Sequence, residues 1–125
     1  MPVVPIEPRP LNDSERAVPE HLLAADFVGA SALRSQLDRT EVVATWGAES
    51  ASVDLRVRGS VRRPALASTP LPVDAPVHDG SGEYIGELLV WAEGGTTLSA
   101  LEYAWVTDEM PTSLPSVDRI RLTAE

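Results

Sequence analysis

Two glutamates, Glu87 and Glu102, have a spacing that predicts acid–base chemistry. They lie in two apolar, aromatic-bearing runs, 86–93 and 96–107, which are separated by a pair of glycines. A Gly-Gly pair supplies the positive φ angles of a two-residue hairpin turn, and that turn would place Glu87 directly opposite Glu102. Paired carboxylates can work as acid and base or hold a divalent cation. A register one residue different would instead leave both glutamates in solvent.

His78 is the third candidate for catalysis, because Asp79 beside it could orient the imidazole as a general base. The chain has only two histidines, no G-x-S-x-G elbow and no paired-histidine metal motif. The segment 79–83 begins like a calcium loop, but Tyr84 stands where such a loop needs glycine and Val90 where it needs an acid. We interpret the segment as a surface turn, and we predict neither a metal site nor a cofactor.

Aromatic residues interspersed with acids indicate a different function, the binding of another protein. Tryptophan and tyrosine are common interface anchors, and carboxylates complement a basic partner. The predicted binding residues are Trp91, Glu93, Tyr103, Trp105, Asp108 and Glu109. The alternative is that the aromatic side chains, Trp46 among them, pack in the core.

The charges of the chain are unevenly distributed. All ten basic residues are arginines, and the formal net charge is −9. Residues 74–125 carry ten acids against two arginines, and seven acids but no base lie between Asp79 and Glu109. Such a surface repels phosphates, so we expect no nucleic acid and no anionic membrane as partner.

Other features of composition narrow the class of protein. There is no cysteine, which excludes disulfides and thiolate chemistry. The longest apolar runs are far shorter than the ~20 residues that span a bilayer, and no leader pattern opens the sequence. We therefore expect a cytoplasmic location.

The N-terminal residues 1–18 are predicted to form a proline-bearing arm. Prolines at positions 2, 5, 8 and 10 exclude a helix interior or a central strand. Such an arm would lie extended on its own domain or on a neighbour, which leaves assembly with a second copy open. Alternatively, the prolines would form a polyproline II edge for a proline-groove partner.

Residues 19–125 are predicted to form one domain. Pro19 suits the first position of a helix, and a second helix is expected over residues 30–37 because apolar side chains recur at helical spacing. Residues 52–58 alternate strictly between apolar and polar side chains, which is typical of a half-buried strand. The other predicted strands are 41–46, 86–93 and 96–107, with a turn at 78–82 and Ile120 and Leu122 forming a short last strand or pinning the terminus to the core.

Part of the chain resembles a family of small uncharacterised proteins of high-GC Gram-positive bacteria. The residues that carry the resemblance are Leu88–Trp91, Leu98–Trp105, Pro111 and Leu114-Pro115, together with the segment 23–37. The resemblance implies a self-contained domain of bacterial origin, and it implies no activity, cofactor or site residue.

The sequence predicts an α+β fold, with two short N-terminal helices packed on a mostly antiparallel sheet of four to six strands. The predicted function is a non-enzymatic protein-binding domain that uses an acidic, aromatic β-hairpin, for example an immunity or inhibitor protein. One alternative is a small hydrolase or metal-assisted enzyme that uses Glu87, Glu102 and His78. Another is a structural subunit that docks through its N-terminal arm.

Overall fold

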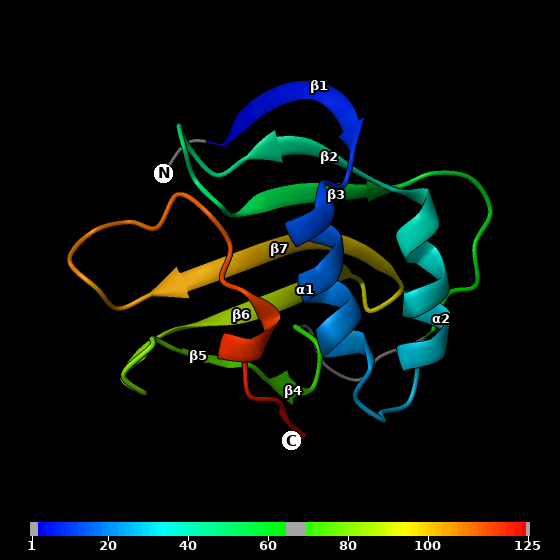
Figure 1. Cartoon of the computed structure of the whole chain (residues 1–125). Coiled ribbons are helices and arrows are strands. Elements are labelled where there is room, and N and C mark those ends of the chain that lie inside the picture. The colour runs from blue at the N-terminus through cyan, green and yellow to red at the C-terminus, as the bar shows by residue number, and fades with distance from the viewer. Residues whose placement is uncertain (1–2, 65–69, 125) are drawn as a thin grey trace.

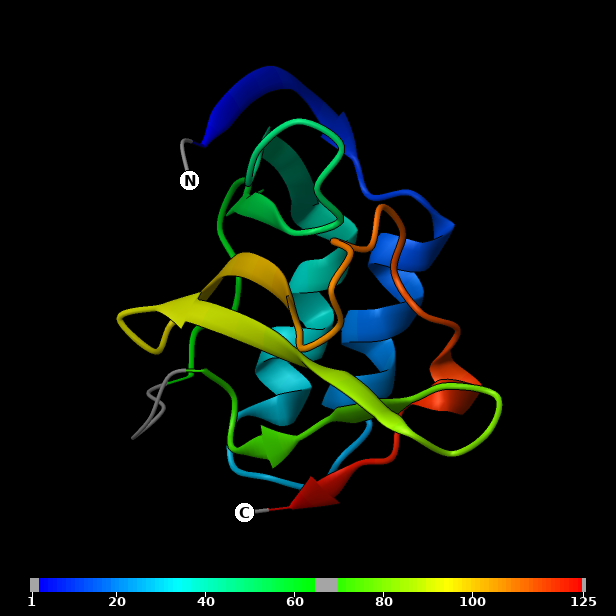
Figure 2. The same cartoon turned by 90° about the vertical axis from the view of Figure 1, so that its left-hand side faces the viewer.

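The computed structural model, which describes residues 3–64 and 70–124, has two helices on one face of a six-stranded sheet (Figures 1 and 2). Every strand pair is antiparallel, and the strand order is β1-β2-β3-β7-β6-β5. The predicted α+β class is thus confirmed. A strand precedes the helices, so the chain does not begin with them as the sequence suggested.

The secondary-structure elements follow one another in a simple order. The strands of the main sheet are β1 Val4–Pro10, β2 Thr40–Thr45, β3 Val53–Val57, β5 Pro76–His78, β6 Tyr84–Glu93 and β7 Thr97–Trp105. The helices are α1 Asp13–Leu23 and α2 Ala30–Gln36, with the 3-10 turns η1 Leu37–Arg39 and η2 Val117–Arg119. The short strands β4 Val73–Asp74 and β8 Thr123–Ala124 pair with each other.

Helix α1 begins at Asp13, so the start predicted at Pro19 is wrong. Asn12 accepts a hydrogen bond of 2.8 Å from the Glu15 backbone N–H, and the Glu15 carboxylate accepts one of 2.9 Å from the Asn12 N–H. This reciprocal capping box satisfies two donors that a helix start leaves open. Pro19 lies inside the helix.

Within the predicted N-terminal arm of residues 1–18, residues 4–10 form an edge strand and residues 13–18 belong to α1. Strand β1 pairs with β2 of its own chain, with a register shift between Pro5 and Arg9. An edge position tolerates prolines because their missing N–H can face away from the partner strand. Arg9 ties the strand to α1 by donating hydrogen bonds of 2.7 and 2.9 Å to the two carboxylate oxygens of Glu15.

The hairpin β6–β7 has a register that differs from the predicted one. Three residues separate the strands, Glu93 pairs with Thr97, and a bulge at Ser99 shifts the ladder by one further residue. Glu87 therefore lies opposite Ala104, and Glu102 lies opposite Leu89. The prediction that Glu87 faces Glu102 is wrong.

The core lies between the helices and the sheet. Its most completely buried members come from both layers: Leu22, Leu23, Leu33, Val42, Val77, Leu88, Leu98 and Leu101. At the β5 edge, Ile120 forms a bridge with Val77 and is 4% exposed. Ile120 thus pins the C-terminal segment to the core, as one of the two sequence interpretations expected.

Candidate functional site

The face of the sheet turned away from α1 and α2, called the open face from here on, carries a distinct set of side chains. Ala100 on β7 pairs with Trp91 on β6 and with Asp54 on β3, so these three side chains point to the same side. Their neighbours in the strands, Leu101 and Val53, point into the core. Aromatic and acidic groups of three strands therefore share the open face.

Two tryptophans on the open face donate hydrogen bonds to carboxylates. Trp46 Nε1 lies 2.8 Å from Asp54 Oδ1, and Trp91 Nε1 lies 3.0 Å from Glu102 Oε1. An ionised carboxylate accepts at about four lone-pair sites, so a single indole N–H leaves most of its capacity free. The indoles orient both carboxylates without neutralising them.

Small residues lie among these tryptophans. Ala44 and Ala100 are 6% and 7% exposed although they belong to the open face. An alanine on an uncovered sheet face can be so buried only where larger neighbouring side chains cover it. The larger side chains of the open face therefore cover these two alanines.

A depression of about 530 Å³ is hollowed into one part of this face. Trp46, Asp54 and Glu102 line it from the open face, and Tyr103 and Trp105, which alternate to the core side of β7, line it where the strand ends. We call it the tryptophan cavity. Neighbouring it, a second depression of about 610 Å³ shares Trp46 and Asp54 and extends to Trp91 and Ser99. The open face is therefore concave on both sides of the Trp46–Asp54 pair.

The two carboxylates of the tryptophan cavity are close neighbours in the sheet. Asp54 pairs with Ala100, and Glu102 lies two residues further along β7 on the same face. Diagonal neighbours of this kind have Cα atoms roughly 7–8 Å apart. No basic residue is among the nine that line the cavity, so a formal charge of −2 is concentrated there.

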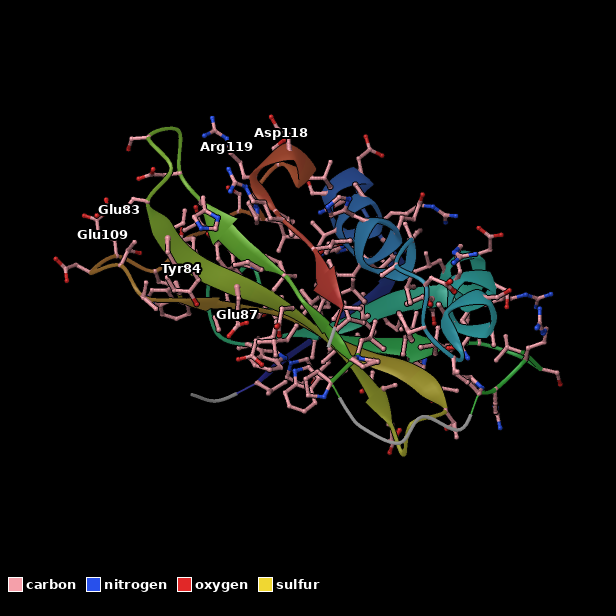
Figure 3. The ribbon with its side chains drawn as sticks, turned by 90° about the horizontal axis from the view of Figure 1, so that it is seen from below. Glu83, Tyr84, Glu87, Glu109, Asp118 and Arg119 are labelled. Atoms are coloured by element: carbon pink, nitrogen blue, oxygen red, sulfur yellow. The ribbon has the colours of Figure 1, made fainter. Side chains whose placement is uncertain are left out.

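The three predicted catalytic residues do not form one constellation. Glu87 lies on the open face, pointing away from the helices (Figure 3). The Glu102 carboxylate accepts from Trp91. His78 ends β5, where its ring makes an edge contact with Tyr84 at 6.0 Å between centroids. Among the residues that the structure describes, no group of three histidines or acids could hold a metal ion.

Asp79 serves the turn that follows His78 and does not orient the imidazole. Its Oδ1 accepts hydrogen bonds from the backbone N–H groups of Ser81 and Glu83 and from the Ser81 hydroxyl. These hydrogen bonds lower the pKa of Asp79 below its usual value. The bond from the Glu83 N–H has the largest effect, and the bond from the Ser81 hydroxyl has the next largest. His78 Nδ1 is buried and has no hydrogen-bond partner within the described part of the chain.

The six predicted binding residues are spread over the hairpin. Glu93 lies at the turn end, whereas Asp108 and Glu109 follow the far end of β7. Glu109 lies at the same end of the sheet as Glu83 (Figure 3). Tyr103 is only 5% exposed, and burial raises its pKa. Trp91 lies on the open face, and Trp105 lines the tryptophan cavity while packing against the edge of the core.

Sequence analysis missed Trp46 and Asp54 as site residues. The alternation over 52–58 did place Asp54 on the polar side of its strand. The alternation could not give the strand order, which places β3 between β2 and β7. The sequence therefore indicated that Asp54 is on the polar side of its strand, but only the strand order shows that Asp54 lies near Trp46 and Glu102.

Comparisons with protein families, curated proteins and solved structures found no match. Within residues 3–64 and 70–124, no helix has the length and apolar character needed to cross a membrane. Function must therefore be inferred from the open face itself.

Proposed function

We propose that the protein is a non-enzymatic binding domain that holds a basic protein partner on its open face. The observation that supports this most directly is the pair of tryptophan-bound carboxylates, Asp54 and Glu102, beside a concave aromatic surface. The hairpin expected from sequence contributes part of this surface through β6 and β7. Strands β2 and β3 contribute the rest.

The physical basis is complementarity of both shape and charge. Aromatic side chains supply large contact areas at low cost in side-chain entropy. Carboxylates with unused acceptor sites gain charge-assisted hydrogen bonds when a cation docks. The excess of acids over residues 74–125 adds a long-range field that speeds the approach of a basic protein.

One concrete form of this function is an immunity or inhibitor protein that covers a basic surface of a toxin or nuclease. Such surfaces are basic because they bind phosphates, and an acidic partner competes for the same arginines and lysines. The proposal therefore makes the partner a protein and places neither nucleic acid nor a membrane on this face.

The two other predicted functions find less support. The enzyme hypothesis rested on Glu87 directly opposite Glu102; the register instead makes them diagonal neighbours on the open face, and His78 lies at the end of β5. The assembly hypothesis rested on an arm that docks elsewhere, whereas β1 pairs with β2 of its own chain and is tied to α1 by the Arg9–Glu15 ion pair.

The experiment co-expresses the chain with products of the genes beside its own and isolates any basic protein that co-purifies. The complex is then challenged with Ser99→Arg, which adds a bulky positive charge at a residue that lines the second depression. We expect this variant to lose the partner because a buried like charge repels the incoming cations.

Val28→Arg is the matched control. Val28 lies between α1 and α2 and is 90% exposed, so the same new charge is placed away from the open face. We expect this variant to retain the complex. A complex that survives Ser99→Arg but is lost with Val28→Arg would contradict the proposal, as would a failure to capture any basic protein.

A further inference from the structure

We infer that the tryptophan cavity binds an arginine side chain of the basic partner. This inference rests on the proposed function, and it names the chemical group that the cavity recognises. Its basis is the combination of two carboxylates and the Trp46 side chain at one hollow.

The cavity's negative charge has no counter-ion among the described residues. Asp54 and Glu102 each accept a hydrogen bond from a tryptophan, and the five ion pairs in the described part of the chain involve other acids. By contrast, Glu15 and Glu41 both pair with arginines of the same chain. Asp54 and Glu102 are therefore among the acids that form no ion pair within the described residues, and they are the two that line the tryptophan cavity.

The aromatic wall favours a planar cation. Trp46 lines the cavity and donates to Asp54 there, and tryptophan is the best aromatic ring for cation–π contacts. A guanidinium is weakly hydrated and flat, so it can stack on an indole while its N–H groups still donate in the plane.

The arrangement of the acids selects arginine over lysine. The guanidinium has five N–H donors directed outward in a rigid fork, whereas the ammonium of lysine is a compact, strongly hydrated point charge. Asp54 and Glu102 lie on adjacent strands as diagonal neighbours, so one flat cation between them can donate to both. An ammonium placed against either carboxylate gains less from the other and cannot stack its plane on the indole while donating sideways.

The test is an NMR titration of the full chain with N-acetyl-arginine methylamide, with N-acetyl-lysine methylamide as the competing probe. The three tryptophans give separate indole N–H signals. The signals of Trp46 and Trp91 report on the cavity because they donate to its two carboxylates. We expect them to move with the arginine probe, with a Kd on the order of millimolar for a ligand of this size.

Amide variants separate charge from folding. Asp54→Asn and Glu102→Gln remove the charge but keep an oxygen that can accept the indole hydrogen bond. We expect each to weaken arginine binding by about fivefold or more. Asp26→Asn, an exposed residue between α1 and α2, removes the same charge away from the open face and should leave the titration unchanged.

Three outcomes would overturn the inference: no movement of the two signals across the millimolar range, equal binding of the lysine probe, or unchanged binding by both amide variants. These outcomes are distinct from a failure of the proposed function. If Ser99→Arg abolishes partner binding but the arginine probe does not bind, the proposed binding surface is supported and the arginine site is refuted. If the arginine probe binds but the partner still binds the Ser99→Arg variant, the arginine site is supported and the proposed binding surface is refuted.

Discussion

The packed helix face and the tryptophan cavity of the open face use their polar groups in different ways. On the helix face, the buried polar side chains use their hydrogen-bonding capacity within the chain. Gln36 is 0% exposed; its amide nitrogen donates to the carbonyls of Arg62 and Thr96, and its oxygen accepts from the Leu98 N–H. Glu15, which is 5% exposed, bonds to Arg9 and to Asn12.

On the open face, the carboxylates of Asp54 and Glu102 each use one oxygen and accept from a neutral indole. A buried polar group without a hydrogen-bond partner lowers the stability of the fold, so such groups are rare in protein cores. Unused carboxylate acceptor sites at a half-buried, concave surface lower the stability of the fold less than they would in the core, and they are available to a ligand. The helix face thus maintains the fold, and the open face has capacity for binding.

The largest effect on stability is expected in the core. Leu101 lies on central strand β7, pairs with Val53 and Val90, and is 0% exposed. Leu101→Ala should lower the free energy of unfolding by about 3 kcal/mol, because it removes buried methyl groups and leaves a cavity. Urea denaturation measures this loss. A loss below about 1 kcal/mol would mean that the helix face is not the packed face.

Gln36→Leu tests the buried polar network on the same face. The substitution introduces an apolar side chain of similar size and leaves two carbonyls and one N–H without their partner. We expect a loss of about 2 kcal/mol in the free energy of unfolding. Ser31→Ala, at an exposed position of the same helix, is the control and should change stability by less than about 0.5 kcal/mol. Equal effects of the two would show that the network does not stabilise the fold.

Glu15 provides a pH-dependent test of the helix face. Burial, the largest single influence, raises the pKa of Glu15, but the hydrogen bonds from Arg9 and from the Asn12 N–H together outweigh it and hold the pKa below the ordinary value of 4.5. Because the folded pKa is lowered, the stabilisation is complete above pH 4.5 and is lost as the pH falls through the folded value.

Glu15→Gln should therefore cost about 1 kcal/mol at neutral pH, a modest value because the Arg9 side chain is 39% exposed. The difference between the variant and the original chain should shrink as the pH falls below 4.5. Denaturation curves at several pH values measure it. A difference that grows in acid would contradict the lowered pKa.

The smallest effect on stability is expected on the open face. Asp54→Asn combined with Glu102→Gln retains acceptors for both indoles and should change the free energy of unfolding by less than about 0.5 kcal/mol. A loss of about 2 kcal/mol would mean that these carboxylates stabilise the fold, which would remove the contrast between the faces.

The sequence predicted the regular elements more successfully than their contacts. The alternation over 52–58 corresponds to β3, and the helical spacing over 30–37 corresponds to α2. Both patterns depend on local periodicity, which a single segment displays by itself. The start of α1 was also written locally, as Asn12 followed three residues later by Glu15, but its capping pattern was overlooked.

The site was harder to predict because it depends on register and strand order. The third residue of the turn and the bulge at Ser99 each shift the register by one, so Glu102 lies opposite Leu89 and not opposite Glu87. Nothing in an apolar run marks where a bulge will form. Likewise, Trp46 and Glu102 are far apart in the chain and meet at one cavity because β3 lies between β2 and β7. Non-local pairing of this kind has no local signature.

The most direct test of the contrast between the faces is the affinity for the basic partner, measured by calorimetry on the Asp54→Asn/Glu102→Gln variant. Asp26→Asn/Asp38→Asn removes the same charge from exposed positions outside both depressions of the open face. If the open face binds the partner, the first variant should bind more than about tenfold more weakly and the second should bind nearly as well as the original chain. Equal affinities of the two variants would contradict a binding role for the open face.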